Sequence, residues 1–189
     1  MTEKQWAESI REFISSKELS NNVKVITLRR IPYAREILEY KLDFEPRKES
    51  SMAFETDLLI YEQIDDIIKP RIIIEAKLSR ITTHDAITYS YKAQSHKTIT
   101  PFIRYGIMIG DRGHYPLPGR LFRHGTNFDF MISFQKEELS SREESAFIVL
   151  LKKELRYSHQ IEEMLLNSRS NNRHRYFVMQ KELRLVETE

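Results

Sequence analysis

The stretch that decides the fold is ETDLLIYEQIDDIIKPRIIIEAKLSR, residues 55–80. Three consecutive isoleucines in it lead directly into Glu75-Ala76-Lys77. Ionised groups are costly to bury unless they are paired or hold a metal. An acid and a base at the end of so apolar a strand therefore need partners, and the rest of the chain must supply them.

The composition indicates one domain without a membrane segment. A chain of 189 residues is long enough to bury a core of its own. Its longest apolar runs, such as residues 72–74 and 147–151, are far too short to span a bilayer. The absence of cysteine excludes disulfides and thiolate metal sites, and the N-terminus lacks the apolar core of a secretory signal. We therefore expect a cytoplasmic protein.

Hydrophobic periodicity predicts an α/β or α+β fold with a central mixed β-sheet flanked by helices. Turn chemistry is expected at Asp65-Asp66 and Pro70, and all five glycines lie in a loop region over residues 106–125. Residues 1–189 form a single domain in this interpretation, with a core over about 4–110 and a loop-rich, helical C-terminal part over 111–189. The expected helices cover residues 4–17, 82–96 and 137–166; the expected strands cover 23–28, 37–44, 53–61, 71–78 and 104–110; a last short element is expected at 176–186.

The period of two along a strand brings three charged side chains together. Glu75 and Lys77 face one side and Ala76 the other, while Glu55 and Asp57 share a face on the preceding strand. Antiparallel pairing of these two strands would place Asp57 beside Glu75 and Lys77. Two carboxylates at short range suit Mg²⁺, and a lysine beside them can orient or deprotonate a water and stabilise an attacked phosphate.

Asp57 followed by Glu75-Ala76-Lys77 on an apolar strand resembles the active-site signature of the PD-(D/E)XK nuclease superfamily. The order of elements over about residues 4–110 resembles it too. The resemblance implies a restriction-endonuclease-like core with a C-terminal helical extension. It also implies that Asp57, Glu75 and Lys77 are catalytic, with Mg²⁺ (or Mn²⁺ in its place) bound by both acids and the Ala76 carbonyl.

On this resemblance we expect a DNA endonuclease, either a type II restriction enzyme or the cleavage subunit of a restriction or defence system. Its partner would be double-stranded DNA, cut by a homodimer or with a partner subunit. Because the net charge is only +2, basic residues would have to gather on one face. The candidates for contact with DNA are Lys92, Gln94, Arg112, Arg120 and Arg123, with His114 and His124 among the arginines. Further acids that could join the metal site are Glu8, Glu12, Glu36 and Glu55.

Two other interpretations remain open from the sequence. Glu75 and Lys77 could form a solvated cross-strand ion pair at a strand end, with Asp57 opening a turn. The function could also be that of a structure-directed resolvase or repair nuclease, or of a non-catalytic DNA-binding or assembly protein. The sequence does not give the recognition site or the position of the cut.

Overall fold

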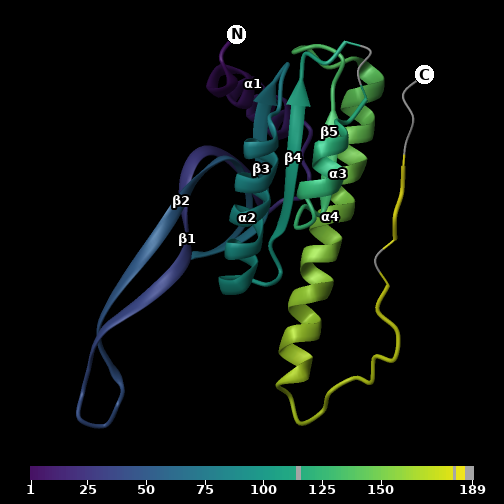
Figure 1. Ribbon diagram of the computed structural model, residues 1–189. Helices are drawn as coiled ribbons and strands as arrows, with labels where there is room; N and C mark the ends of the chain where they lie inside the picture. The colour runs from purple at the N-terminus through teal and green to yellow at the C-terminus, as the bar shows by residue number, and fades with distance from the viewer. Residues whose placement is uncertain (114–115, 181, 186–189) are drawn as a thin grey trace.

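The computed structural model describes residues 1–113, 116–180 and 182–185. Its described strands form one mixed sheet in the order β1-β2-β3-β4-β5, with helices on both faces (Figure 1). In chain order the elements are α1 (Glu3–Ser16), β1 (Val23–Tyr40), β2 (Pro46–Ile64), β3 (Ile67–Leu78), α2 (Thr83–Ile99), β4 (Arg104–Gly110), α3 (Gly119–His124), β5 (Phe130–Ser133) and α4 (Ser141–Ser168).

Strand β3 lies in the middle of the sheet and is covered on both faces. It pairs antiparallel with β2 and parallel with β4, and α2 makes the crossover between β3 and β4. Ile72 and Ile74 pack into one cluster with α1 and α4, whereas Ile73 packs into another with α2. The isoleucine run is thus buried on both sides, as predicted for a central strand.

Side-chain caps fix where the long helices begin. Thr82 accepts a hydrogen bond from the Asp85 backbone, and the Asp85 carboxylate accepts one from the Thr82 backbone. Such a capping box satisfies two backbone donors at a helix start, so the predicted beginning of α2 is confirmed. Ser140 makes the same arrangement for α4, which therefore begins at Ser141 and not at the predicted residue 137.

The hairpin of β1 and β2 is much longer than predicted. Its two strands pair from Val23↔Glu62 out to Tyr40↔Pro46, and the outer part projects from the body of the molecule (Figure 1). We call this outer part, residues 33–52, the arm. The prediction of a strand as far as residue 44 was wrong, because the chain turns there and Phe44 takes a left-handed φ of 64°.

Two further predictions were wrong. Pro70 is not in the turn but inside β3, where it faces Tyr61 next to a bulge in the β2–β3 register; a bulge tolerates the missing donor of proline. The described residues of the last predicted element, 176–180 and 182–185, have no regular secondary structure. Within the parts of the chain that the structure describes, no helix has the length and apolarity needed to cross a membrane.

Candidate functional site

The site lies where β2 and β3 part. Their ladder ends at Leu58↔Ile74, while β2 continues along β1 toward the arm. Beyond that point the backbone N–H of Ala76 donates to Asp57 Oδ2 at 2.8 Å. Asp57 therefore takes the place of the missing strand partner, and its carboxylate is held beside Glu75-Ala76-Lys77 as the sequence predicted.

Glu75 is buried on the α2 side of the sheet. It is only 1% exposed, and its Oε1 accepts a hydrogen bond from the Tyr105 hydroxyl on β4. Lys92 Nζ, from α2, lies 3.5 Å from the same oxygen. Burial raises the pKa of Glu75 to about 7; Lys92 and the Tyr105 hydrogen bond oppose the rise, and the charge of Asp57 adds to it.

Lys77 has other partners than the sequence indicated. Its Nζ lies 3.1 Å from Glu3 Oε2 and 3.9 Å from Asp85 Oδ1, and 5.3 Å from the centre of the Tyr89 ring. Desolvation works to lower the pKa of Lys77, but the Tyr89 hydroxyl and Glu3 outweigh it, and the pKa is raised. The raised pKa favours the ammonium form of Lys77.

These contacts rule out the solvated ion pair between Glu75 and Lys77. Glu75 is buried and paired with Lys92, and Lys77 is paired with Glu3. Lys77 shares that face of β3, but the cation in direct contact with Glu75 is Lys92, which α2 brings to this place. Asp57 does not open a turn either, since it lies inside β2.

The donor set of the site fits Mg²⁺. The charge of Asp57 helps to raise the pKa of Glu75. A cation bound between the two carboxylates would offset this repulsion. The N–H and C=O of a strand residue point the same way, so the Ala76 carbonyl faces β2 with its N–H. In the described residues no group of three or more acids or histidines is arranged to hold a metal, so an ion at the fork would have two carboxylates and would take its other ligands from the Ala76 carbonyl and water.

Three of the four additional acids considered from the sequence lie away from this site, and the fourth, Glu55, lies at its edge. Glu8 accepts hydrogen bonds from Arg11 and Thr27; Thr27 pairs with Leu58, whose side chain packs on the α1 face. Asp57, one residue along, points to the opposite face. Glu12 and Glu36 are exposed, the latter in the arm, and Glu55 is exposed at the mouth of the fork.

The residues expected to contact DNA lie in different places and have different partners. Lys92 points into the site, whereas Gln94 on the same helix is exposed. Two of the loop arginines hold the chain that follows β3. Arg112 donates to the Ser79 carbonyl at 2.6 Å and Arg120 to the Ile81 carbonyl at 3.0 Å. Arg123 and His124 lie on α3, the former exposed, and His114 is outside the described residues.

Sequence reasoning missed three residues of the site. Tyr105, Tyr89 and Glu3 come from β4, α2 and α1, and each contacts Glu75 or Lys77. The segment 104–110 indicated a buried strand, and a single tyrosine hydroxyl within it must find a partner. That was the one available signal for Tyr105; nothing in the sequence indicated that Glu3 reaches β3.

A salt titration tests the arginines. Replacing both Arg120 and Arg123 by glutamine should flatten the slope of log affinity against log salt by about one unit for each lost phosphate contact. Binding is measured on duplex DNA with Ca²⁺ in place of Mg²⁺. The control is Arg47→Gln with Lys48→Gln, two equally charged changes in the arm, which should leave the slope unaltered. A slope unchanged by the first pair would place the DNA surface elsewhere.

No protein-family model matches the chain, and no curated protein matches it. Among solved structures, the pre-specific restriction endonuclease BsaWI, determined in complex with DNA, is similar at a TM-score of 0.46 and 11% sequence identity. The alignment covers 85% of this chain and 64% of that one, so the present chain spans less than two thirds of its length.

Proposed function

We propose that the chain is a Mg²⁺-dependent endodeoxyribonuclease that hydrolyses phosphodiester bonds of double-stranded DNA. Within that class it is a type II restriction enzyme or the cleavage subunit of a restriction or defence system. The observation that carries the proposal is the fork between β2 and β3, where a buried glutamate faces an aspartate beside two lysines. A cut through both strands takes two sites, so we expect a homodimer or a partner subunit.

The acidic side chains of the site would bind the metal ion, and the basic ones act on the water, the phosphate and Glu75. Asp57, Glu75 and the Ala76 carbonyl would hold Mg²⁺, which supplies Lewis acidity and lowers the pKa of a bound water. Lys77, fixed as an ammonium ion by Glu3 and Tyr89, orients the attacking water and stabilises the negative charge that grows on the phosphate. Tyr105 and Lys92 hold the Glu75 carboxylate in one orientation.

The test is cleavage of supercoiled plasmid with Mg²⁺ and with a chelator. Asp57→Asn should abolish nicking, whereas Glu12→Gln, at an exposed position of α1, should retain it. Mapping the ends then sorts the candidates: discrete ends support a restriction enzyme, and scattered ends a structure-directed nuclease. DNA binding without any cleavage would leave the non-catalytic DNA-binding protein.

Metal binding can be measured apart from cleavage. Titration calorimetry with Mn²⁺ or Ca²⁺ should give a heat of binding for the wild type, and Glu75→Ala should remove most of it because half of the carboxylate pair is lost. Glu162→Ala serves as a control for the loss of a carboxylate, since Glu162 pairs with Arg71 and Lys69 instead. Unchanged heat in the Glu75 variant would show that the fork does not bind the ion.

A further inference from the structure

In the arm, no third strand among the described residues pairs with β1 or β2. Ladder partners exist only between β1 and β2 over this part, because β3 joins β2 from Leu58 onward. A two-stranded ribbon is marginally stable in water and gains from a third strand or another packing surface. Both of its outer edges carry unpaired backbone groups, which are ready to pair with another chain.

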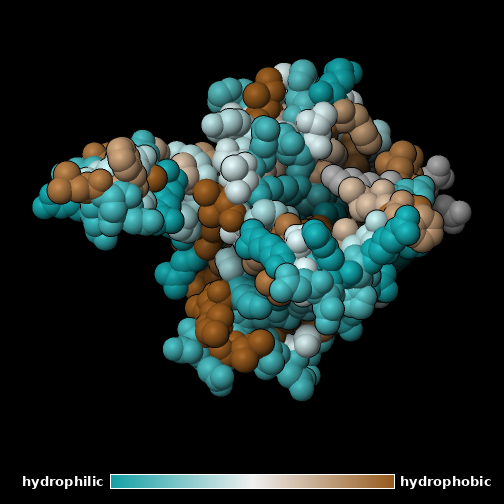
Figure 2. Space-filling view, turned by 90° about the horizontal axis from the view of Figure 1, so that it is seen from below, coloured by the Kyte–Doolittle hydropathy of each residue, from teal (hydrophilic) through white to brown (hydrophobic). Residues whose placement is uncertain are grey.

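The arm also exposes large apolar side chains, most of all at its tip. Leu42 is fully exposed and Phe44 is 84% exposed, and the protrusion at the left of Figure 2 shows the hydrophobic patches on its surface. Ile37, Leu38 and Tyr40 are exposed along β1. Contiguous apolar surface of this kind marks an interaction site.

The charges of the arm do not suit a nucleic acid. Residues 33–52 contain four basic and five acidic side chains, and the charges are largely paired inside the arm. Arg35 pairs with Glu49, and Glu39 lies 3.8 Å from Arg47 and 3.9 Å from Lys48. No net positive charge remains to meet phosphates, so the arm fits a protein surface.

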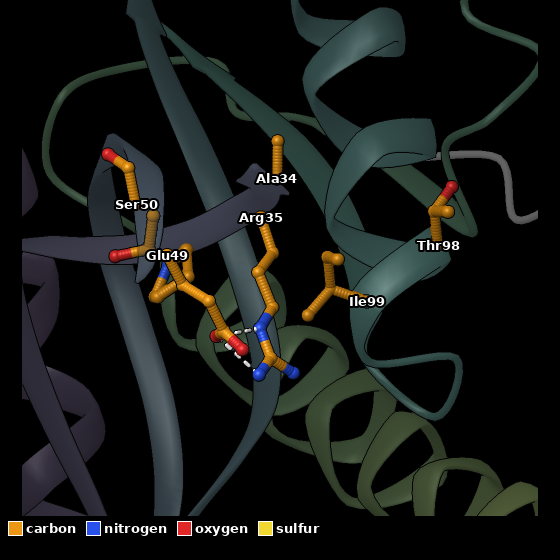
Figure 3. A pocket seen from close by; sticks show the side chains of 8 residues that line it. Ala34, Arg35, Glu49, Ser50, Thr98 and Ile99 are labelled. Atoms are coloured by element: carbon orange, nitrogen blue, oxygen red, sulfur yellow. Dashed lines mark hydrogen bonds and ion pairs between the residues drawn. The ribbon is translucent and has the colours of Figure 1, made fainter. Parts of the chain in front are cut away.

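A groove with both polar and apolar lining side chains lies at the base of the same arm. It has a volume of about 580 Å³, within the range of roughly 300–1,000 Å³ that takes drug-sized ligands. The arm forms one wall and the end of α2 the other, with Arg35 and Ile99 facing each other across it (Figure 3). Its lining residues are Pro32, Ala34, Arg35, Glu49, Ser50, Ser51, Thr98 and Ile99.

We propose that this groove receives the arm tip of a second copy of the chain. Two arms lie antiparallel about a two-fold axis, so that Leu42 and Phe44 of each copy sit between Ile99 and Pro32 of the other. The tip cannot reach its own groove, because eight residues of extended strand, roughly 26 Å, separate Leu42 from Ala34. One surface is thereby self-complementary, which is what a closed two-fold dimer requires.

The size of the contact agrees with this partner. A stable interface takes about 20–30 residues from each side, and the arm, residues 33–52, has 20 residues. Contact between two arms also gives each two-stranded ribbon a further packing surface. This contact would be the interface of the homodimer that is expected under the proposed function. The tests below measure mass and crosslinking, and their results do not depend on cleavage.

Sedimentation velocity tests the dimer. The wild type should sediment at twice the chain mass of 22.6 kDa, and Leu42→Glu with Phe44→Glu should raise the dissociation constant at least about 100-fold. Val149→Glu, on an isolated exposed position of α4, should leave it unchanged. A wild type that stays monomeric, or a dimer indifferent to the tip, would overturn the proposal while leaving plasmid cleavage to be judged separately.

Crosslinking tests the place of the tip. The chain has no cysteine, so single variants Phe44→Cys and Ile99→Cys can be mixed and oxidised. A disulfide needs Cα atoms within about 7 Å, and only the mixture should therefore give a covalent dimer. Phe44→Cys mixed with Val149→Cys is the control and should remain uncrosslinked. A mixture of the first pair that yields no covalent dimer would show that another surface, or another protein, covers the arm.

Discussion

Replacing Lys77 by alanine is expected to leave a folded protein that binds DNA and metal but cleaves plasmid about 10²–10⁴-fold more slowly. The side chain is held beside the fork by Glu3 and the Tyr89 ring, and its raised pKa favours the cation. Hydrolysis builds negative charge on the attacked phosphate, and a preorganised cation stabilises it without further rearrangement. A single-turnover time course with saturating Mg²⁺ measures the loss.

Two variants separate this role from structure. Glu3→Gln removes one of the two contacts that hold Lys77 but keeps the cation, so it should lose much less activity than Lys77→Ala. Lys92→Ala tests the other lysine, which contacts Glu75 directly. If Lys77→Ala cuts as fast as wild type and Lys92→Ala does not, the cation of the reaction is Lys92. If neither variant is slower, the fork does not perform this chemistry.

The carboxylate pair could be predicted because its cause is local. A period of two places Glu75 and Lys77 on one face, and a short turn forces β2 and β3 to pair antiparallel, so Asp57 arrives at Ala76. The capping box of Thr82 is equally local. Each of these features depends on residues fewer than about 25 positions apart, and strand periodicity and turn length are enough to place them.

The rest of the site depends on how helices and strands pack against β3, which the periodicity of the sequence does not predict. Lys92 reaches Glu75 only because α2 lies across β3, and Tyr105 does so only because β4 pairs parallel to it. Glu3 pairs with Lys77 because α1 begins at the same end of the sheet. The length of the arm was missed for a different reason. Its outer residues are exposed, so they lack the buried face that fixes strand register and makes a strand visible in sequence.

The contribution of Glu75 to the stability of the apo protein should fall as the pH rises, because its carboxyl group is buried. Its pKa is raised from 4.5 to about 7 in the folded state, so the folded chain binds more protons than the unfolded chain between these values. Stability is then full below about pH 4.5 and decreases until the pH exceeds the folded pKa. A shift of this size corresponds to about 3 kcal/mol of unfolding free energy.

Glu75→Gln should remove that pH dependence, since an amide does not titrate. Urea unfolding of both proteins from pH 4.5 to 8 measures the difference in slope, and Glu55→Gln, exposed and outside the fork, should keep the wild-type slope. Identical slopes for wild type and Glu75→Gln would mean that Glu75 is not desolvated.

The same measurement distinguishes a metal ligand from a merely buried acid. At pH 8 the Glu75 carboxylate is ionised beside Asp57, and a cation that binds both should stabilise the folded state by about 2.7 kcal/mol at a hundred times its dissociation constant. Mg²⁺ should therefore restore at pH 8 most of the stability that deprotonation removes, in the wild type but not in Glu75→Gln. Without this dependence on Glu75, burial alone would explain the raised pKa, and the acid would have a structural role. With it, the cost of placing an acid at the end of three isoleucines is offset by the ion that the fork holds.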